Sequence, residues 1–250
     1  MTTPEAPVGR LLIDTLTRQQ YRRSGYGVVP NGLAEPSLGC LRLACEACMA
    51  EETFESAGRS RLHGDGTPRA FFGVHEVQPG ARDIAVDELS PLASEVLEVP
   101  PSQLYLFQTK LTLSSTSSGS GFDWHQDFGK WHKRDGVRDP SAMTTVVVFL
   151  DDVGPGSGPL TVLPATHCRG LVDPDRHWFD QPQDAGGDPV AAVILVGPPG
   201  TVTMLHPLLL HGSPPRRHRQ RRLLFFATFN RRDNSPVRRR SPTYFSASPD

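Results

Sequence analysis

The sequence has few cysteines and aromatic residues, almost no net charge and no long apolar run. Only 4 of the 250 residues are cysteine, 8% are aromatic, and the formal net charge is -1 at pH 7. A near-neutral chain has no general attraction to nucleic acids or to acidic membrane surfaces. No apolar segment approaches the roughly 20 residues that cross a bilayer. We therefore expect a small-molecule partner rather than a nucleic acid or a membrane.

The cysteines do not form a metal-binding or redox motif. Cys45 and Cys48 have the CxxC spacing, but no second pair completes a four-thiolate zinc site and no strand precedes them. Apolar residues recur every three or four positions within residues 38–54, which is the period of an amphipathic helix. We expect both thiols on the buried face of that helix.

The first residues do not resemble a secretory signal. Residues 1–8 are polar and contain proline, and the apolar run 11–13 is interrupted at once by Asp14. This pattern predicts a cytoplasmic protein, which we expect to be a monomer or a homodimer.

Proline and glycine are abundant, with 24 and 23 residues, and this favours a core of strands joined by turns. A chain of this length is typical of one domain, residues 1–250, with loose tails at 1–9 and about 235–250. The patterns predict helices at 17–24 (capped by Thr17), 38–54 and 87–97, loops at 56–68 and 114–121, and strands at 26–29, 69–75, 104–113, 122–128, 144–150, 160–163, 190–196, 201–205 and 223–229. The run at 144–150 is apolar on both faces, as in a strand buried between layers. The predicted fold is mainly β, a jelly-roll or barrel with the N-terminal helices on one side.

An aromatic-rich run, Phe122–Phe128, contains a histidine and an aspartate two residues apart. In a strand, His125 and Asp127 would point to the same face and hold one ion between them. His211, which follows an apolar run and begins a turn at Gly212, supplies a second imidazole from a distant part of the chain. Two imidazoles and one carboxylate leave roughly three positions open on an octahedral ferrous ion, the arrangement of non-haem iron oxygenases.

His206 competes for the role of the second imidazole. It lies five residues before His211, so in a regular strand the two side chains would face opposite ways, and Pro207 follows it directly. We therefore interpret His206 as structural.

Arginines dominate residues 216–240, where Asp233 is the only acidic residue. Arg222 differs from the others because an apolar run, residues 223–226, follows it at once. An arginine held by such a strand offers a fixed pair of donors to a carboxylate, which lysine imitates poorly. We interpret the segment as a solvated loop with one functional arginine; the alternative is a patch that binds phosphate or an anionic substrate.

Three motifs in this order, residues 124–128, 158–167 and 205–213, together resemble the phytanoyl-CoA dioxygenase family of iron(II)- and 2-oxoglutarate-dependent oxygenases. The resemblance extends over about residues 104–230, and residues 124–136 are most similar to ectoine hydroxylase and to bacterial hydroxylases of free amino acids. It implies a double-stranded β-helix, a jelly-roll of the cupin type, with flanking N-terminal helices.

The resemblance also implies the chemistry and the residues of the site. Iron(II), 2-oxoglutarate and O₂ would be required, and three residues would be both metal ligands and catalytic residues. Relatives that halogenate lack a carboxylate ligand, so Asp127 favours hydroxylation. The implied residues are the iron ligands His125, Asp127 and His211 and the 2-oxoglutarate contacts Arg222, Ser213 and Thr112.

Substrate contacts are implied at Gln108 and Trp131, which occupy the positions of a substrate-binding glutamine and tryptophan in ectoine hydroxylases. Arg69, at the start of a predicted strand, is a further candidate for binding a substrate carboxylate. The sequence departs from those enzymes at Gly129-Lys130, where they have an acidic residue, and at residues 165–167, where they have Gly-Ser-His. These departures affect the substrate rather than the iron chemistry, and they point away from ectoine itself.

The sequence therefore predicts an iron- and 2-oxoglutarate-dependent hydroxylase of a small amino acid or amino-acid-like metabolite, in natural-product metabolism. One alternative keeps this chemistry but acts on a carrier- or coenzyme-A-linked acyl group, whose phosphates would meet the arginines after His211. A second alternative is a β-barrel binding protein in which the three predicted ligands form an ordinary polar cluster.

Overall fold

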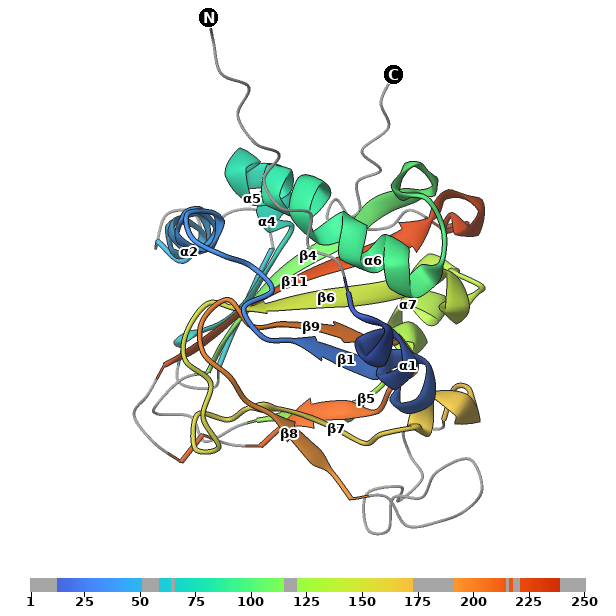
Figure 1. The fold of residues 1–250 in the computed structure, drawn as a ribbon. Helices are drawn as coiled ribbons and strands as arrows, with labels where there is room; N and C mark the ends of the chain where they lie inside the picture. Colours follow the sequence, from blue (N-terminus) through green and yellow to red (C-terminus); the bar gives the residue numbers. More distant parts are fainter. Residues whose placement is uncertain are drawn as a thin grey trace, which may run out of the picture.

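The computed structural model describes residues 13–50, 59–63, 66–114, 121–172, 191–214, 216–217 and 221–238. Two antiparallel sheets face each other, and helices cover the outer face of the larger sheet (Figure 1). The predicted tail at 1–9, most of the one at 235–250, and residues 115–120 of a predicted loop lie outside the described residues. Within the described part of the chain, no helix has the length and apolarity needed to cross a membrane.

The larger sheet contains seven strands. In spatial order they are β1 (Tyr26–Val29), β9 (Val202–Leu205), β6 (Met143–Phe149), β11 (Arg222–Arg231), β4 (Leu104–Ser114), β3 (Pro68–Phe72) and β2 (Ser60–Leu62). β6 is buried along its whole length, because Val146 and Val148 pack toward the helices while Val147 and Phe149 pack toward the smaller sheet. The predicted strand between two layers is therefore confirmed.

The smaller sheet contains four short strands, in the order β5 (Phe122–His125), β10 (His211–Ser213), β7 (Leu160–Val162) and β8 (Val193–Leu195). Apolar side chains from both sheets, among them Phe149, Val162 and Phe226, fill the space between them. The sequence predicts a turn after His211, whereas the structure has a strand there. β10 forms because it pairs with β5 on one side and with β7 on the other.

Helices from the N-terminal part of the chain cover the outer face of the larger sheet (Figure 1). The buried sides of Cys45 and Cys48 face this apolar layer, as the helical period predicts, and burial raises the pKa of the Cys48 thiol to about 11. These helices are α1 (Thr15–Ser24), α2 (Ser37–Cys48), α4 (Val74–Val77), α5 (Pro79–Ile84), a π-helical turn (Ala85–Leu89) and α6 (Ser90–Leu97). A further helix, α7 (Asp127–Asp135), follows β5. Short 3₁₀ turns occur at Pro101–Gln103, Pro140–Ala142, Thr166–Arg169 and Arg232–Asn234.

Several predicted boundaries are wrong. Asp14 rather than Thr17 caps α1, because the Asp14 carboxylate accepts a hydrogen bond from the Thr17 backbone N–H at 2.6 Å. α2 ends at Cys48, and residues 51–54 of the predicted helix lie outside the described residues. β3 ends at Phe72 rather than at residue 75, because Gly73 adopts a positive φ of 72° and begins α4.

The predicted helix at 87–97 begins earlier than its pattern indicates. Three helical segments follow one another from Pro79 to Leu97, with the π-helical turn in the middle. Pro91 lacks the N–H that would continue an α-helical ladder, and a π turn directly before it accommodates that missing bond. Strand β2 was also not predicted, because it lies inside the segment 56–68, which the sequence predicts to be a loop.

Candidate metal centre

Three elements bring the predicted iron ligands together. His125 is the last residue of β5, Asp127 is the first residue of α7, and His211 is the first residue of β10. His125 and His211 are direct partners in the β5–β10 ladder. The prediction of one strand through residues 122–128 is wrong, because the chain leaves the sheet after His125; the two side chains meet at a strand-to-helix corner.

Gln126 fixes this corner. Its side-chain Nε2 donates to the backbone carbonyls of Leu208 at 2.6 Å and Gly170 at 2.9 Å. Its Oε1 accepts from the backbone N–H of Val172 at 2.8 Å. Three hydrogen bonds to one buried amide leave the corner little freedom, so the side chains on both sides of Gln126 are held in place.

The three ligand side chains lie at distances that suit one ion. Their potential ligand atoms all lie within 4.8 Å of one another. Asp127 is central, with Oδ1 at 3.5 Å from His125 Nε2 and Oδ2 at 3.7 Å from His211 Nε2. An ion between these atoms would have both imidazoles and the carboxylate on one side, and its remaining positions would be open.

Backbone carbonyls set the orientation of both imidazoles. Nδ1 of His125 donates to the carbonyl of Asp123 at 2.7 Å, and Nδ1 of His211 donates to the carbonyl of Leu209 at 3.0 Å. Because a carbonyl oxygen only accepts hydrogen bonds, Nδ1 of each ring carries a proton, and Nε2 is the ring nitrogen that faces Asp127. This is the arrangement that metal-binding histidines use.

Charge at the centre also suits a cation. Burial, followed by the neighbouring His125, lowers the pKa of His211 to about 4, so its imidazole is neutral at pH 7. Burial alone would raise the pKa of Asp127, but the positive charge of Lys110, followed by interactions with His125 and His211, holds that pKa well below its usual range. An ionised carboxylate beside the neutral imidazole of His211 suits a divalent ion.

A narrow cavity adjoins the two histidines on one side. Strands β4, β10 and β11 form its walls. The polar residues that these strands contribute are Lys110, Thr112, Ser213 and Arg222. Arg222 is 2% exposed, and its Nη1 donates to Ser213 Oγ at 3.2 Å. Arg222 Nε and Thr112 Oγ1 are buried without a hydrogen-bond partner, and no carboxylate of the described residues pairs with Arg222.

Arg222 therefore carries a buried charge that has no counter-ion among the described residues. Burial, with the nearby Arg216 adding to it, lowers the pKa of Arg222 to about 10, so the guanidinium is still positive at pH 7. A buried cation of this kind is costly unless an anion compensates it. The cavity thus has the chemistry of a carboxylate site next to the metal centre.

Lys110 is a residue of this cavity that the sequence analysis does not single out. Its Nζ lies over the ring of Phe226 at 4.3 Å from the centroid. Burial lowers the pKa of Lys110, the charge of Asp127 opposes this effect, and Lys130 adds to it. The sequence distinguishes Lys110 from its neighbours, because it is the only charged residue between Leu104 and Ser114.

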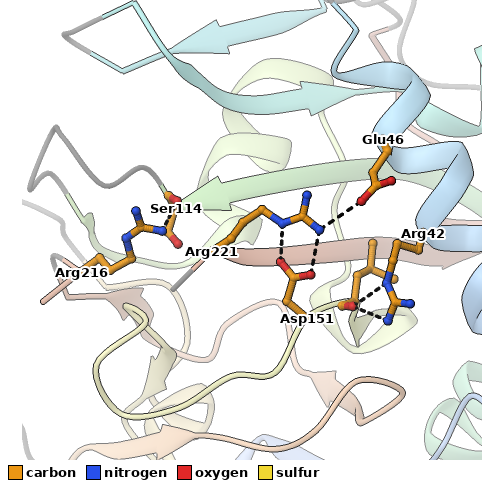
Figure 2. A network of polar contacts seen from close by, with 7 residues as sticks. Arg42, Glu46, Ser114, Asp151, Arg216 and Arg221 are labelled. Carbon is orange, nitrogen blue, oxygen red and sulfur yellow. Dashed lines mark hydrogen bonds and ion pairs between the residues drawn. The ribbon is translucent and has the colours of Figure 1, made fainter. Parts of the chain in front are cut away.

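Two arginines near Arg222 are engaged elsewhere (Figure 2). Arg216 donates to the backbone carbonyl of Ser114 at 2.9 Å. Arg221 forms a two-point contact with Asp151 at 2.9 and 3.0 Å and also reaches Glu46 of α2 at 3.1 Å. These contacts anchor the start of β11, and they leave Arg222 as the arginine of this group that lines the cavity. Arg219, Arg239 and Arg240 of the predicted basic segment lie outside the described residues.

The residues predicted to contact substrate, unlike the predicted metal ligands, do not come together at one place in the structure. Gln108 is buried on β4 and shares a face with Lys110 and Thr112. Trp131 is buried in an apolar cluster, edge-on to Phe107 at 5.5 Å between ring centroids. Neither lines the narrow cavity, and their substrate roles stay predictions.

Arg69, the third predicted substrate contact, lies against the start of β5. Its guanidinium is 4.3 Å from the centre of the Phe122 ring, and Nη2 donates to the carbonyl of Gly121 at 3.0 Å. It does not line the narrow cavity, although Phe122 does. The competing histidine, His206, packs against His167 with ring centroids 5.0 Å apart and accepts a hydrogen bond from the Leu208 N–H, in agreement with a structural role.

A second, larger cavity of about 840 Å³ begins on another side of His125. It extends over α7 toward residues 171–172 and 237–238. Its walls include Trp124 and Gln126, which flank His125 in the chain. The metal centre thus lies at the meeting point of two cavities, a narrow one with a buried arginine and a wide one along α7.

Comparisons with known proteins identify the family of this chain. Residues 21–223 match the family described as Phytanoyl-CoA dioxygenase (PhyH). The chain is 30% identical to L-proline trans-4-hydroxylase from Streptomyces griseoviridis, over 90% of this chain and 89% of that protein. It is 26% identical to ectoine dioxygenase from Halomonas elongata, over 98% of this chain and 78% of that protein.

Solved structures share the fold. The crystal structure of EctD from S. alaskensis with 2-oxoglutarate and 5-hydroxyectoine superposes with a TM-score of 0.79 at 24% identity, over 99% of this chain and 86% of that one. The structure of EctD with bound Fe gives a TM-score of 0.76 at 25% identity, over 96% of this chain and 84% of that one. The predicted fold, mainly β with a double-stranded β-helix core, is confirmed. The chain belongs to the phytanoyl-CoA dioxygenase family.

Proposed function

We propose that this protein is an iron(II)- and 2-oxoglutarate-dependent dioxygenase that hydroxylates an unactivated C–H bond of a small amino acid or amino-acid-like molecule, in specialised metabolism. Relatives named for the hydroxylation of L-proline and for ectoine dioxygenation support the substrate class. The observation that carries the proposal is an ionised carboxylate between two imidazoles, directly beside a cavity that contains a buried guanidinium without a counter-ion among the described residues.

The donor set fits ferrous iron. His125, Asp127 and His211 offer two imidazole nitrogens and one carboxylate, which is the facial triad that leaves sites open for a co-substrate and oxygen. When bound there, iron supplies the redox chemistry by which O₂ is activated at the expense of 2-oxoglutarate. The protein's contribution is to hold the three ligands, to keep the imidazole of His211 neutral and to keep Asp127 ionised.

We assign the distal carboxylate of 2-oxoglutarate to the narrow cavity on the basis of its charge. Arg222 would hold this group with its free Nε and an Nη, while Ser213 Oγ keeps the other side of the guanidinium in place. Thr112 Oγ1, which is buried without a partner, is available for a hydrogen bond to the same molecule. Lys110 adds a second positive charge to a cavity that would contain a dianion.

The overall reaction balances in atoms and electrons. One oxygen atom of O₂ enters the substrate as hydroxyl, and the other enters succinate when 2-oxoglutarate loses CO₂. The four electrons that reduce O₂ come in pairs from the keto acid and from the substrate C–H bond. Asp127 would hold the iron through its carboxylate, and a carboxylate ligand favours hydroxylation of the substrate.

The test is succinate release by the anaerobically iron-loaded protein after O₂ is admitted, with L-proline, other free amino acids and cyclic derivatives as substrates. We predict that Asp127→Ala abolishes release, because the metal loses its only anionic ligand among the three. Asp123→Ala is the matched control, since it removes an exposed carboxylate four residues before Asp127 and keeps the backbone carbonyl that orients His125.

Wild-type rates in Asp127→Ala would refute the triad. A wild-type protein that neither binds iron nor releases succinate would restore the alternative of a non-enzymatic β-barrel binding protein.

A further inference from the structure

The wide cavity along α7 differs in chemistry from a site for a free amino acid. Its volume of about 840 Å³ lies in the upper part of the range of roughly 300–1,000 Å³ that small-molecule sites occupy. It reaches the metal centre at Trp124, His125 and Gln126, and its far end lies near residues 237–238. A substrate that fills this cavity would extend well beyond the carbon atom that is hydroxylated.

Positive charge lines this cavity. Lys130 and Lys133 lie one turn apart on α7, and Arg138 and Arg238 follow on neighbouring segments. Among the described residues of the lining there is no aspartate or glutamate. No ion pair joins any of these four cations to a carboxylate of the described residues.

The acidic residues of α7 itself are used elsewhere. Asp127 belongs to the metal centre, and Asp135 is fully buried and binds Arg134 at 3.1 and 3.2 Å. The cations of the cavity therefore have no neutralising group on their own helix. Apolar side chains complete the wall, among them Leu171 and Val237, which are 51% and 60% exposed.

The use of lysine in this chain points to the same region. The sequence contains three lysines and 23 arginines. Lys110 lines the narrow cavity, and Lys130 and Lys133 line the wide one. Every lysine of the protein thus lies in one of the two cavities that meet at His125.

We propose that the wide cavity binds an anionic group of the substrate, a phosphate or a carboxylate, through Lys130, Lys133, Arg138 and Arg238. This proposal rests on the proposed function, since the amino-acid-like part of the same molecule would reach the metal centre. The substrate is then larger than free proline or ectoine, with apolar atoms against Leu171 and Val237 and a negative charge at its outer end. Arg216 and Arg221 do not contribute to this site, because both are engaged elsewhere within the protein (Figure 2).

The lysines allow a direct test by NMR. Reductive methylation with ¹³C-formaldehyde keeps the positive charge and labels only the three lysines and the chain's amino terminus. Lys→Arg variants assign the signals, and zinc serves as a diamagnetic substitute for iron. We expect inorganic pyrophosphate or glutarate to move the Lys130 and Lys133 signals in a saturable way, and 2-oxoglutarate to move that of Lys110.

Charge reversal tests whether the anion binds at this site. Lys133→Glu should weaken anion binding by about tenfold or more, on the scale of one charge-assisted hydrogen bond. Arg23→Glu is the matched control, because Arg23 also lies in the exposed last turn of a helix, α1, where a positive charge interacts with the helix dipole. The control should leave the affinity unchanged within about twofold.

The outcomes separate the two proposals. Tighter binding of pyrophosphate assigns a phosphate-bearing substrate, and tighter binding of glutarate assigns a carboxylate. Lys130 and Lys133 signals that neither anion moves, or equal losses in Lys133→Glu and Arg23→Glu, would overturn the anion site. A Lys110 signal that 2-oxoglutarate does not move would count against the proposed function alone.

Discussion

Asp127 has two roles at the scale of a single residue. It is the central member of the metal centre, and it is the first residue of α7. The N-terminus of a helix favours a negative charge, so the start of α7 helps to keep this carboxylate ionised. The turn of the chain from strand to helix directly after Gln126 thus positions the ligand, and the helix start adds to the effect of Lys110 on its charge state.

Arg222 and Arg221 are neighbours with opposite environments, and they make a matched pair. We predict that Arg222→Ala weakens 2-oxoglutarate binding by at least about 3 kcal/mol, or more than about 100-fold, because one partner of a buried charge pair is lost. Arg221→Ala removes an exposed ion pair with Asp151 and Glu46 and should cost less than about 1 kcal/mol. Calorimetric titration of the metal-loaded protein under nitrogen measures both, and equal affinities in the two variants would place the carboxylate site elsewhere.

Residue types identified most of the site from the sequence. His125, Asp127, His211 and Arg222 could be chosen because few other functions explain imidazoles, a carboxylate and an isolated strand arginine in that order. Lys110 could not be assigned to the same site in this way. Strand alternation predicts which side chains share a face, but it does not predict which element lies opposite that face, so the cavity appears only when β4, β10 and β11 are assembled.

At the scale of elements, the sequence predicted long strands better than short ones. β6 and β11 have seven and ten residues, and their apolar patterns predict them. β10 has three residues, which is less than two periods of strand alternation, and only its pairing with β5 and β7 makes it a strand. Helix α7 was not predicted, and its start could not be, because Gln126 is held by contacts with distant segments rather than by its neighbours.

The contact between β10 and β5 leaves no room for a side chain at Gly212. A Cβ atom there would lie 2.8 Å from the backbone oxygen of Phe122. We predict that Gly212→Ala pushes β5 away from β10, lowers the free energy of unfolding by about 1–3 kcal/mol and weakens iron binding, because His125 and His211 belong to these two strands.

Gly80→Ala is the control for this prediction. Gly80 lies in α5, and a Cβ atom there would have nothing within 4 Å. The free energy of unfolding of the Gly80→Ala protein should be unchanged or raised by up to about 1 kcal/mol, since alanine is the better helix former. Urea unfolding and iron titration measure both variants, and full iron affinity in a destabilised Gly212→Ala protein would contradict the link between the strand contact and the site.

At the scale of the whole molecule, buried neutral histidines make stability depend on pH. Burial lowers the pKa of His75, with Arg59 and Arg82 adding to it, to about 4. Burial and the neighbouring His167 lower the pKa of His206 to about 4 as well. The unfolded chain, with an ordinary histidine pKa near 6.5, therefore binds more protons than the folded chain between these values. Their contribution to stability is complete above about pH 6.5 and is lost as the pH falls toward 4.

We predict that the free energy of unfolding of the metal-free protein falls by at most about 3 kcal/mol per buried histidine between pH 7 and pH 4. His206→Asn should flatten part of this dependence, because the amide oxygen replaces the Nδ1 acceptor that receives the Leu208 N–H at 3.1 Å and does not titrate. Urea unfolding at several pH values measures the slope. An unchanged slope in His206→Asn would show that the imidazole is not the titrating group.

The same helix that begins at Asp127 carries Lys130 and Lys133 on its outer face, within nine residues. A metal ion bound at the start of α7 and an anion bound along its side would therefore both contact the same short helix. Thermodynamic linkage then requires reciprocity: the factor by which the metal changes the affinity for the anion equals the factor by which the anion changes the affinity for the metal. An affinity for substrate measured on the metal-free protein is accordingly a different quantity from the affinity of the working enzyme.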